Sequence, residues 1–206
     1  MLSDGEMKKQ TKKAIRQTAF LALGIIMVMV VISIIVDKGQ WKEPTISQDI
    51  LKHKPLVEKY AEEYQIASYV DVLLAMMMQE SGGRGTDPMQ SSESYCGQIG
   101  CIDNPELSIK QGVFYFSETL KDAEYDLELA IQSYNFGRGF ISYVQETSGQ
   151  YTEEVAIAFS KEMYENAPDK SIYSCLRKEA KQYDACYGDI YYVRSVMGYV
   201  DLIREQ

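Results

Sequence analysis

The sequence predicts a mainly α-helical protein, in which a single N-terminal transmembrane helix is followed by one α-helical domain. Three observations predict this fold class. An apolar run near the N-terminus is long enough to cross a membrane, apolar residues recur at helical spacing through most of the remaining chain, and no well-bounded alternating strand pattern occurs. With 206 residues, the chain has room for this span and for a domain that buries a hydrophobic core.

The N-terminal region has the pattern of a signal-anchor. Residues 19–36 contain no charged residue, and Ser33 is the only polar side chain among them. At a rise of about 1.5 Å per residue, this run is just long enough to span the hydrocarbon core of a membrane. The basic residues precede it, in residues 1–18. We therefore expect a single-pass protein of the cell membrane with a cytoplasmic N-terminus and an outward-facing domain.

A cleavable signal peptide is the alternative explanation of the same run. Such peptides usually have an apolar region of about 7–15 residues that ends in a small-x-small cleavage site. Here the run is longer and ends in the letters IIVD, without such a site. We therefore expect an uncleaved anchor and a short linker over residues 37–47, in which Trp41 suits the membrane interface. The extracytoplasmic domain of residues 48–206 is then expected to work close to the membrane.

Helical spacing of apolar residues begins early in this domain. Leu56, Tyr60 and Tyr64 recur every four residues, so we expect a helix that begins just after Pro55. Three further helical stripes follow: Val70, Leu73, Leu74 and Met77; Ile109, Val113, Phe116 and Leu120; and Leu127, Ala130, Ile131 and Tyr134. Gly137 follows the last stripe and is expected to end its helix.

Two more helices are expected in the C-terminal part. Thr152 followed by two glutamates is typical of a helix start, because threonine caps free backbone N–H groups and acidic residues suit the positive end of the helix dipole. This helix is expected to extend through Tyr164, and a last helix is expected over Ile190–Ile203. The only strand pairing that the pattern allows is a small β-hairpin around Cys96–Ile102.

The charge distribution limits the partners of the protein. The formal net charge is −9, and residues 1–36 hold five basic and two acidic residues, a net +3, which leaves −12 for the remainder. An acidic domain repels the phosphate backbone of nucleic acids, so we expect no nucleic-acid partner. No long heptad seam occurs, so we expect a monomer.

All four cysteines follow the predicted membrane span, where an oxidising environment favours disulfides. Four cysteines allow three connectivities. The local pairs Cys96–Cys101 and Cys175–Cys186 are favoured because each closes a single loop, and unpaired thiols are the alternative. A metal site of four cysteines needs closely spaced C-x₂-C pairs, which are absent from the sequence. We therefore expect no metal and no other cofactor.

Glu80 is the first candidate for chemistry. On a helix it shares a face with Leu73, Met76 and Met77, and a carboxylate on an apolar face is costly unless it is protonated or paired. Desolvation raises the pKa of such a group, which suits a general acid that works near neutral pH. The alternative is a solvated glutamate at a helix end, since Gly82 follows closely.

Three further positions carry polar groups suited to a catalytic cleft. Asp87 is either a second carboxylate across a cleft from Glu80 or, because Asp-Pro pairs commonly open turns, an ordinary turn residue. Tyr134 and Asn135 either bind a ligand or simply end a helix. His53, the only histidine, lies beside two lysines and a proline in an expected exposed turn, so we expect no histidine-dependent triad.

Three motifs, in order, resemble the lysozyme-like superfamily, which contains goose-type lysozymes and soluble lytic transglycosylases. They are Gln79-Glu80-Ser81-Gly82-Gly83, then Met89-Gln90-Ser91, then the run AIQSYNFG from Ala130 to Gly137. Within this superfamily the chain looks most like the CwlT-like lysozyme domain, a membrane-tethered muramidase module of bacterial cell-wall hydrolases. The resemblance extends over residues 50–200, nearly the whole predicted domain.

The resemblance implies a peptidoglycan hydrolase, namely an N-acetylmuramidase that cleaves the β-1,4 glycosidic bond between MurNAc and GlcNAc in glycan strands. Carried over residue by residue, Glu80 is the general acid, and Asp87 helps to position or activate the attacking water. Four residues are implied to bind the sugar: Gln90, Ser91, Tyr134 and Asn135.

Two departures from the family pattern affect this interpretation. In lytic transglycosylases the second motif reads G-L-M-Q, and here Asp87-Pro88 replaces Gly-Leu, which favours hydrolysis. Many relatives also carry a C-terminal cysteine-peptidase domain, whereas this sequence ends at Gln206, so we expect no second activity. The alternatives are a lytic transglycosylase that forms 1,6-anhydroMurNAc ends and, from a different class, a low-activity wall-binding or secretion accessory protein.

Overall fold

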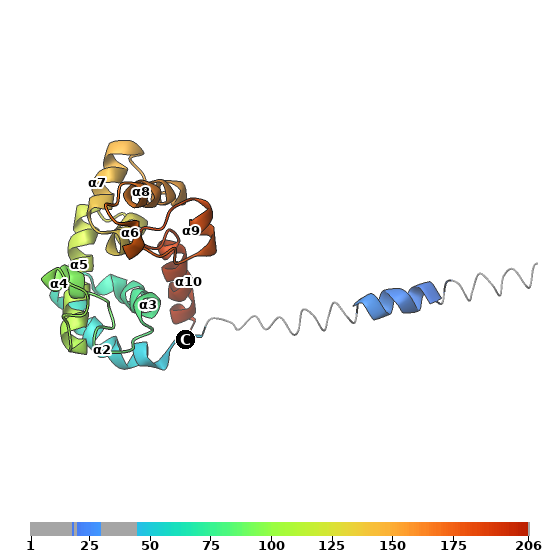
Figure 1. The fold of residues 1–206 in the computed structure, drawn as a ribbon. Helices are drawn as coiled ribbons and strands as arrows, with labels where there is room; N and C mark the ends of the chain where they lie inside the picture. The colour runs from blue at the N-terminus through green and yellow to red at the C-terminus, as the bar shows by residue number, and fades with distance from the viewer. Residues whose placement is uncertain (1–17, 19, 30–44, 206) are drawn as a thin grey trace, which may run out of the picture. The chain divides into compact units, whose positions relative to one another are not determined.

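The structure is a computed structural model that describes residue 18, residues 20–29 and residues 45–205. The chain divides into two units, Met1–Glu43 and Pro44–Gln206, and each is described by itself. In the first unit, residues 20–29 are helical and exposed (Figure 1).

The predicted membrane span falls only partly on the described residues. Residue 19 and residues 30–36 of the predicted span 19–36 lie outside them, as do residues 37–44 of the predicted linker. Across the described ranges, the structure contains no helix with the length and apolar character needed to cross a membrane.

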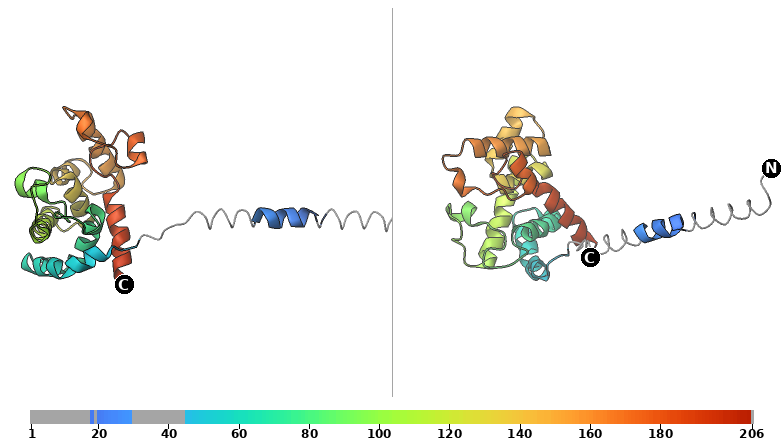
Figure 2. Two further views of the ribbon diagram at one scale, coloured as in Figure 1. Left: turned by 60° about the horizontal axis from the view of Figure 1, so that its bottom comes forward. Right: turned by 45° about the vertical axis from the view of Figure 1, so that its right-hand side comes forward.

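The second unit is helical throughout its described part, with no strand in residues 45–205. Its helices are α2 (Gln48–Glu63), α3 (Val70–Glu80), α4 (Ser92–Cys96), α5 (Pro105–Asp122), α6 (Leu127–Phe136), α7 (Gly139–Thr147), α8 (Glu153–Glu165), α9 (Lys178–Gln182) and α10 (Tyr192–Arg204), with short 3₁₀ turns at Ala67–Tyr69 and Lys170–Ile172. Helix α3 packs against both α2 and α10, and α5 packs against α2 and α6 (Figures 1 and 2).

Helix α3 is the central helix of this unit. Its residues Leu73, Leu74, Ala75, Met76 and Met77 are all fully buried, so the helix is apolar around its whole circumference. Burying one such leucine or methionine side chain stabilises the fold by about 1.5–3 kcal/mol. The core therefore holds the C-terminal end of α3, where Glu80 lies, in a rigid position.

Helix α2 begins earlier than predicted. The side chain of Ser47 caps it by accepting a hydrogen bond from the backbone nitrogen of Asp49, and Pro55 lies inside the helix. The prediction that this helix begins after Pro55 is wrong. A proline inside a helix costs a backbone hydrogen bond, but Ile50 and Val57, seven residues apart on one face, are both fully buried and offset this cost.

Other helix boundaries agree with the local sequence. Helix α6 ends at Phe136, directly before Gly137. The hydroxyl of Thr152 accepts a hydrogen bond from the backbone nitrogen of Val155 and caps α8, as predicted. The predicted last helix corresponds to α10.

The β-hairpin predicted around Cys96–Ile102 is wrong. Helix α4 ends at Cys96, and turns follow it. The backbone nitrogen of Ile102 donates to the hydroxyl of Ser92, 3.1 Å away, and so has a side-chain partner instead of a neighbouring strand. The predicted disulfides Cys96–Cys101 and Cys175–Cys186 are both present.

Candidate active site

Helix α3 ends at Glu80, and the turn that follows passes close to the start of α2. Gly83 has a φ of +78°, and a Cβ there would lie 2.7 Å from the backbone nitrogen of Ile50, so this turn requires a glycine. His53 on α2 is half-buried, and its Nε2 lies 3.1 Å from the carbonyl oxygen of Gly83. The prediction that His53 lies in an exposed turn is therefore wrong, because His53 fastens the turn after Glu80 to α2.

The carboxyl group of Glu80 is half-buried and accepts a hydrogen bond at Oε1 from the phenol of Tyr192, at 2.5 Å. Burial raises the pKa of Glu80 from 4.5 to about 7, the hydrogen bond from Tyr192 opposes this rise, and the negative charges of Asp87 and Asp189 add to it. A carboxyl with this pKa is protonated in about half of the molecules at neutral pH. Glu80 therefore has the acidity that a general acid requires.

Tyr192 was not found from the sequence. It is the first residue of α10 and is fully buried, although the chain has 16 tyrosines and none stands out locally. A buried tyrosine hydroxyl usually has a hydrogen-bond partner, but which partner depends on how α10 packs against α3.

The carboxylate of Asp87 accepts hydrogen bonds from four donors at 3.1 Å or less, and the hydroxyl of Ser91 lies farther away, at 3.4 Å from Oδ1. Its Oδ1 accepts from the backbone nitrogen of Ser91 at 2.9 Å and from the hydroxyl of Ser108 at 2.6 Å. Its Oδ2 accepts from the backbone nitrogen of Ser92 at 3.1 Å and from the Ser92 hydroxyl at 2.6 Å. Burial alone raises the pKa of Asp87, but the hydrogen bonds from Ser108, Ser92 and Ser91 outweigh burial and hold this pKa below 3.8.

Asp87 is therefore ionised at neutral pH, and its acceptor positions are filled. A carboxylate offers about four lone-pair positions, two on each oxygen, and the four donors occupy them. The bonds to Ser91 and Ser92 fasten the loop that precedes α4, and the bond to Ser108 fastens this loop to α5.

Gln90 and Ser91, the two polar residues after Met89, differ in exposure to solvent. Gln90 is exposed, has a φ of +48°, and donates from its side-chain amide to the carbonyl oxygen of Asp87 at 2.8 Å. Ser91 is buried, and its hydroxyl donates to the carbonyl oxygen of Ser108 at 2.9 Å. Gln90 is thus available to a ligand, whereas the hydroxyl of Ser91 holds the loop.

Tyr134 and Asn135 occupy the end of α6 and hold the loops around them. The phenol of Tyr134 donates to the carbonyl oxygen of Met89 at 2.8 Å. The side-chain oxygen of Asn135 accepts from the backbone nitrogen of Asp189 at 2.7 Å. Gly188 has a φ of +62°, and a Cβ there would lie 2.7 Å from the Asn135 side-chain oxygen, so only glycine permits this close approach.

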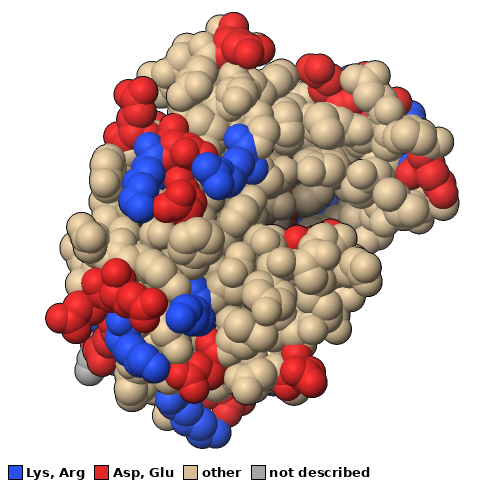
Figure 3. All heavy atoms as spheres, turned by 90° about the vertical axis from the view of Figure 1, so that its left-hand side faces the viewer, with Lys and Arg blue, Asp and Glu red and all other residues tan. Residues whose placement is uncertain are grey.

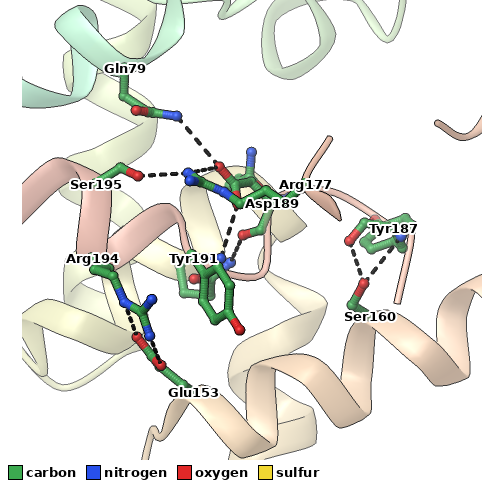
Figure 4. Close-up of polar contacts among 11 residues, drawn as sticks. Gln79, Glu153, Ser160, Arg177, Tyr187, Asp189, Tyr191, Arg194 and Ser195 are labelled. Atoms are coloured by element: carbon green, nitrogen blue, oxygen red, sulfur yellow. Dashed lines mark hydrogen bonds and ion pairs between the residues drawn. The ribbon is translucent and has the colours of Figure 1, made fainter. Parts of the chain in front are cut away.

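An ion pair of a buried aspartate and a partly exposed arginine lies beside Glu80 and was not predicted. Asp189 is only 4% exposed and accepts two hydrogen bonds from Arg177, Nε to Oδ1 and Nη2 to Oδ2, both at 2.6 Å (Figure 4). Nη2 of Arg177 also donates to the hydroxyl of Ser195 on α10, and the amide of Gln79 on α3 lies 3.5 Å from Oδ2 of Asp189. Sequence gave no signal for this pair, since neither residue belongs to a recognised motif.

These residues line three adjoining cavities. The central cavity has a volume of about 240 Å³, and its walls include five of the six predicted site residues: Glu80, Asp87, Gln90, Tyr134 and Asn135. The sixth, Ser91, lines a neighbouring cavity together with Tyr115 and Tyr187. A third cavity on the other side shares Glu80 and Asn135 and adds Arg177, Leu176 and Asp189. Figure 3 shows a hollow on one face of the domain, with acidic and basic atoms inside and largely uncharged walls.

In the described part of the chain, no group of three or more His, Cys, Asp or Glu side chains is placed to hold a metal ion.

The family model described as Lysozyme-like matches residues 47–200. The chain is 38% identical over 164 residues to an uncharacterized membrane protein, YocA, of Bacillus subtilis (strain 168), and the match covers 78% of this chain and 72% of YocA. It is 37% identical over 162 residues to the bifunctional muramidase/DL-endopeptidase CwlT of the same strain, covering 79% of this chain and 45% of CwlT.

A solved structure is also similar. The chain is 41% identical, with a TM-score of 0.66, to a protein of Staphylococcus aureus subsp. aureus Mu50 described as similar to a lipoprotein of the NLP/P60 family. The match covers 76% of this chain and 54% of that chain. The chain thus spans about half the length of CwlT and of the staphylococcal protein.

Proposed function

This chain belongs to the lysozyme-like family, and from this premise we propose that it is a peptidoglycan hydrolase, specifically an N-acetylmuramidase that cleaves the β-1,4 bond between MurNAc and GlcNAc. The likeness to CwlT, whose name includes muramidase, supports this substrate and this bond. YocA, a relative described as a membrane protein, supports a location at the cell membrane. The proposed substrate requires that the domain face the wall.

The observation that carries the proposal is the state of Glu80. Glycoside hydrolysis requires a protonated carboxyl beside the glycosidic oxygen, and a pKa of about 7 supplies one at neutral pH. Because the phenol of Tyr192 donates to Oε1 of Glu80, the proton of the neutral carboxyl resides on Oε2. Tyr192 is thus a positioning residue that leaves the acidic proton on the oxygen available to the substrate.

The reaction begins with proton transfer from Glu80 to the glycosidic oxygen, which leaves with the GlcNAc residue as its bond to C1 of MurNAc breaks. Positive charge then develops at C1. Asp87 is ionised and lines the same cavity, so its negative charge stabilises this positive charge. Water attacks C1 and loses a proton to solvent, and the Glu80 carboxylate takes up a proton from solvent, which restores the acid and completes hydrolysis.

Sugar binding is assigned to the amides of Gln90 and Asn135 and to the aromatic wall of the cleft. Gln90 lines the central cavity with its side chain exposed, and the amide nitrogen of Asn135 remains for a ligand because its oxygen is bonded to Asp189. Tyr115 and Tyr187 line the neighbouring cavity, where their ring faces suit the apolar face of a pyranose.

A lytic transglycosylase is the second candidate, and the bonding of Asp87 favours it. A carboxylate whose acceptor positions are filled by four donors is poorly suited to take a proton from water. In transglycosylation, the 6-hydroxyl of the same MurNAc attacks C1 and no water is needed. Glu80 then acts first as the acid and afterwards as the base.

The test is mass spectrometry of the soluble fragments that the full chain releases from purified peptidoglycan. Reducing MurNAc ends support the muramidase, whereas fragments one water lighter, with 1,6-anhydro ends, support the transglycosylase. The Glu80→Gln variant is expected to release neither while keeping its fold.

Glu146→Gln is the matched control, because Glu146 is exposed on α7 and lines none of the three cavities. It is expected to release the same fragments as the unmodified protein. Undiminished release by Glu80→Gln would contradict the assignment of Glu80. Binding of peptidoglycan without any release by the unmodified protein would instead support the wall-binding alternative.

A further inference from the structure

We infer that Arg177 is a specificity-determining residue, which binds a carboxylate of the lactyl-peptide substituent on MurNAc. The inference rests on the proposed function and deepens it, because it names the part of the substrate that one wall of the cleft recognises. It stands on the place of Arg177 in the third cavity, beside Glu80.

The guanidinium of Arg177 is held in a defined orientation. Nε and Nη2 donate to the two oxygens of Asp189, and Nη2 also donates to the hydroxyl of Ser195. These bonds use all the hydrogens on Nε and Nη2. Nη1 makes no hydrogen bond to any residue in the described ranges, and the side chain is 31% exposed. Arg177 therefore presents two N–H donors of Nη1 to a ligand, with its orientation already set.

Arg177 is also the only Lys or Arg among the described residues that line the three cavities, whose acidic members are Glu80, Asp87, Glu93 and Asp189. An acidic cleft repels an anionic substrate unless one group receives the negative charge. Arginine suits this task because it remains charged and because the free Nη1 can form charge-assisted hydrogen bonds to a carboxylate oxygen.

The proposed substrate carries such an anion close to the bond that is cleaved. MurNAc differs from GlcNAc by a lactyl ether, which ends in a carboxylate when the stem peptide is absent and in an amide-linked peptide with its own carboxylates when it is present. The lactyl carboxylate and the carboxylates of the stem peptide can each accept hydrogen bonds from Nη1. The exposed side chain of Leu176, 64% exposed in the same cavity, adds an apolar contact suited to the lactyl or an alanyl methyl group.

A second arginine nearby provides a comparison within the same structure. Arg194 on α10 pairs with Glu153, and both Arg194 and Arg177 lie near the ring of Tyr191, at 4.1 and 5.8 Å from its centre (Figure 4). Arg194 lines none of the three cavities. Arg194→Gln therefore removes an ion-paired arginine from the same region without touching the cleft, and it is the matched control for Arg177→Gln.

The experiment measures binding in the full chain, on the Glu80→Gln background so that no ligand is cleaved. Three probes are used: a chitin oligosaccharide, which has no carboxylate; a peptide-free MurNAc–GlcNAc oligosaccharide, which has lactyl carboxylates; and a MurNAc–GlcNAc oligosaccharide with stem peptides. Arg177→Gln is expected to weaken binding of at least one of the two MurNAc ligands roughly tenfold and to leave chitin binding unchanged. A tenfold loss is at the lower end of what the loss of a hydrogen bond to a charged group causes.

The two MurNAc ligands distinguish the sources of the carboxylate. A loss confined to the peptide-free ligand assigns the lactyl carboxylate, and a loss confined to the peptide-bearing ligand assigns a stem carboxylate. Arg177→Lys keeps the charge and is expected to recover part of the lost binding. Arg194→Gln is expected to bind all three probes as the Glu80→Gln parent does.

Equal affinities of the Arg177→Gln variant and its parent for both MurNAc ligands would overturn the inference and leave the proposed function intact. An equal loss for all three probes, or no recovery by Arg177→Lys in a protein with an unchanged melting temperature, would also overturn it. If the Glu80→Gln parent binds none of the probes, the proposed function fails, and the inference fails with it.

Discussion

The phenol oxygen of Tyr192 lies 2.5 Å from Oε1 of Glu80 and donates a hydrogen bond to it. Glu80 ends α3 and Tyr192 begins α10, so the packing of these two helices sets the contact. The hydrogen bond favours the ionised form of Glu80, whereas burial favours the protonated form, and the pKa of about 7 reflects the balance.

Replacing Tyr192 with phenylalanine is expected to move the pH dependence of the reaction. The variant loses the hydrogen bond that lowers the pKa of Glu80, so this pKa rises further. A general acid works while it is protonated, and the alkaline limb of kcat/KM should therefore shift upward by about one pH unit. Tyr199→Phe on the same helix is the control. An alkaline limb that stays in place in Tyr192→Phe would show that this hydrogen bond does not tune the acid.

Replacing Glu80 with glutamine is expected to increase stability at alkaline pH. The folded pKa of about 7 exceeds the reference value of 4.5, so the folded state binds this proton more tightly than the unfolded state. This contribution is fully present below about pH 4.5 and is lost as pH rises towards 7. Glutamine cannot ionise, so the free energy of unfolding of the variant should exceed that of the unmodified protein by up to about 3 kcal/mol at pH 8.

Urea denaturation at pH 5 and pH 8 checks this expectation. The difference between Glu80→Gln and the unmodified protein should be small at pH 5 and should grow at pH 8. The Glu146→Gln control should show no such growth. If the free energies of unfolding of the two proteins differ by the same amount at both pH values, then burial does not raise the pKa of Glu80 in the folded protein.

Replacing Asp87 with asparagine is expected to reduce the formation of either product type. A carboxamide has only one oxygen and places an NH₂ donor opposite the donors of Ser91 or Ser92, so the loop before α4 loosens. We expect a loss of about 1–3 kcal/mol in the free energy of unfolding and a fall in total turnover, with no change in the ratio of reducing to 1,6-anhydro ends.

Ser108→Ala is the graded control for this prediction, because it removes one donor to Asp87 and leaves the carboxylate in place. Its effect on stability and on turnover should be smaller. If Asp87→Asn instead abolishes reducing ends while 1,6-anhydro ends persist, then Asp87 acts on the attacking water.

Removing the disulfide Cys175–Cys186 is expected to destabilise the wall that carries Arg177. The bond closes a loop across 11 positions and lies next to the segment that ends in Asp189. The double change Cys175→Ser and Cys186→Ser should lower the free energy of unfolding by about 2–3 kcal/mol, measured by urea denaturation. Removing Cys96–Cys101, which closes only 5 positions, should cost somewhat less. Equal free energies of unfolding for the oxidised and the reduced protein would show that the disulfides do not stabilise the fold.

Local signals in the sequence specify much of this domain. The apolar circumference of Leu73–Met77 places α3 in the core, and the Thr152 cap starts α8. The short spacing of Cys96 and Cys101 favoured the disulfide between them, which the structure contains. The start of α2 was misjudged because a proline inside a helix is a strong local stop signal, and burial of Ile50 outweighs it.

The resemblance of three motifs to the lysozyme-like superfamily predicted one site that contains Glu80, Asp87, Gln90, Tyr134 and Asn135, and these five residues line one cavity. Their bonding partners were beyond the reach of sequence patterns. Caps, turns and helical stripes act over a few residues, because they depend on backbone groups within one or two helical turns. Tyr192 meets Glu80 across 112 positions and Gln79 meets Asp189 across 110, and such contacts exist only after α10 has packed against α3. The residue types and their order are therefore encoded locally. The pKa of Glu80, the donors around Asp87 and the partial exposure of the Arg177 guanidinium arise instead from tertiary packing, because desolvation and hydrogen bonding depend on which distant groups surround each charge.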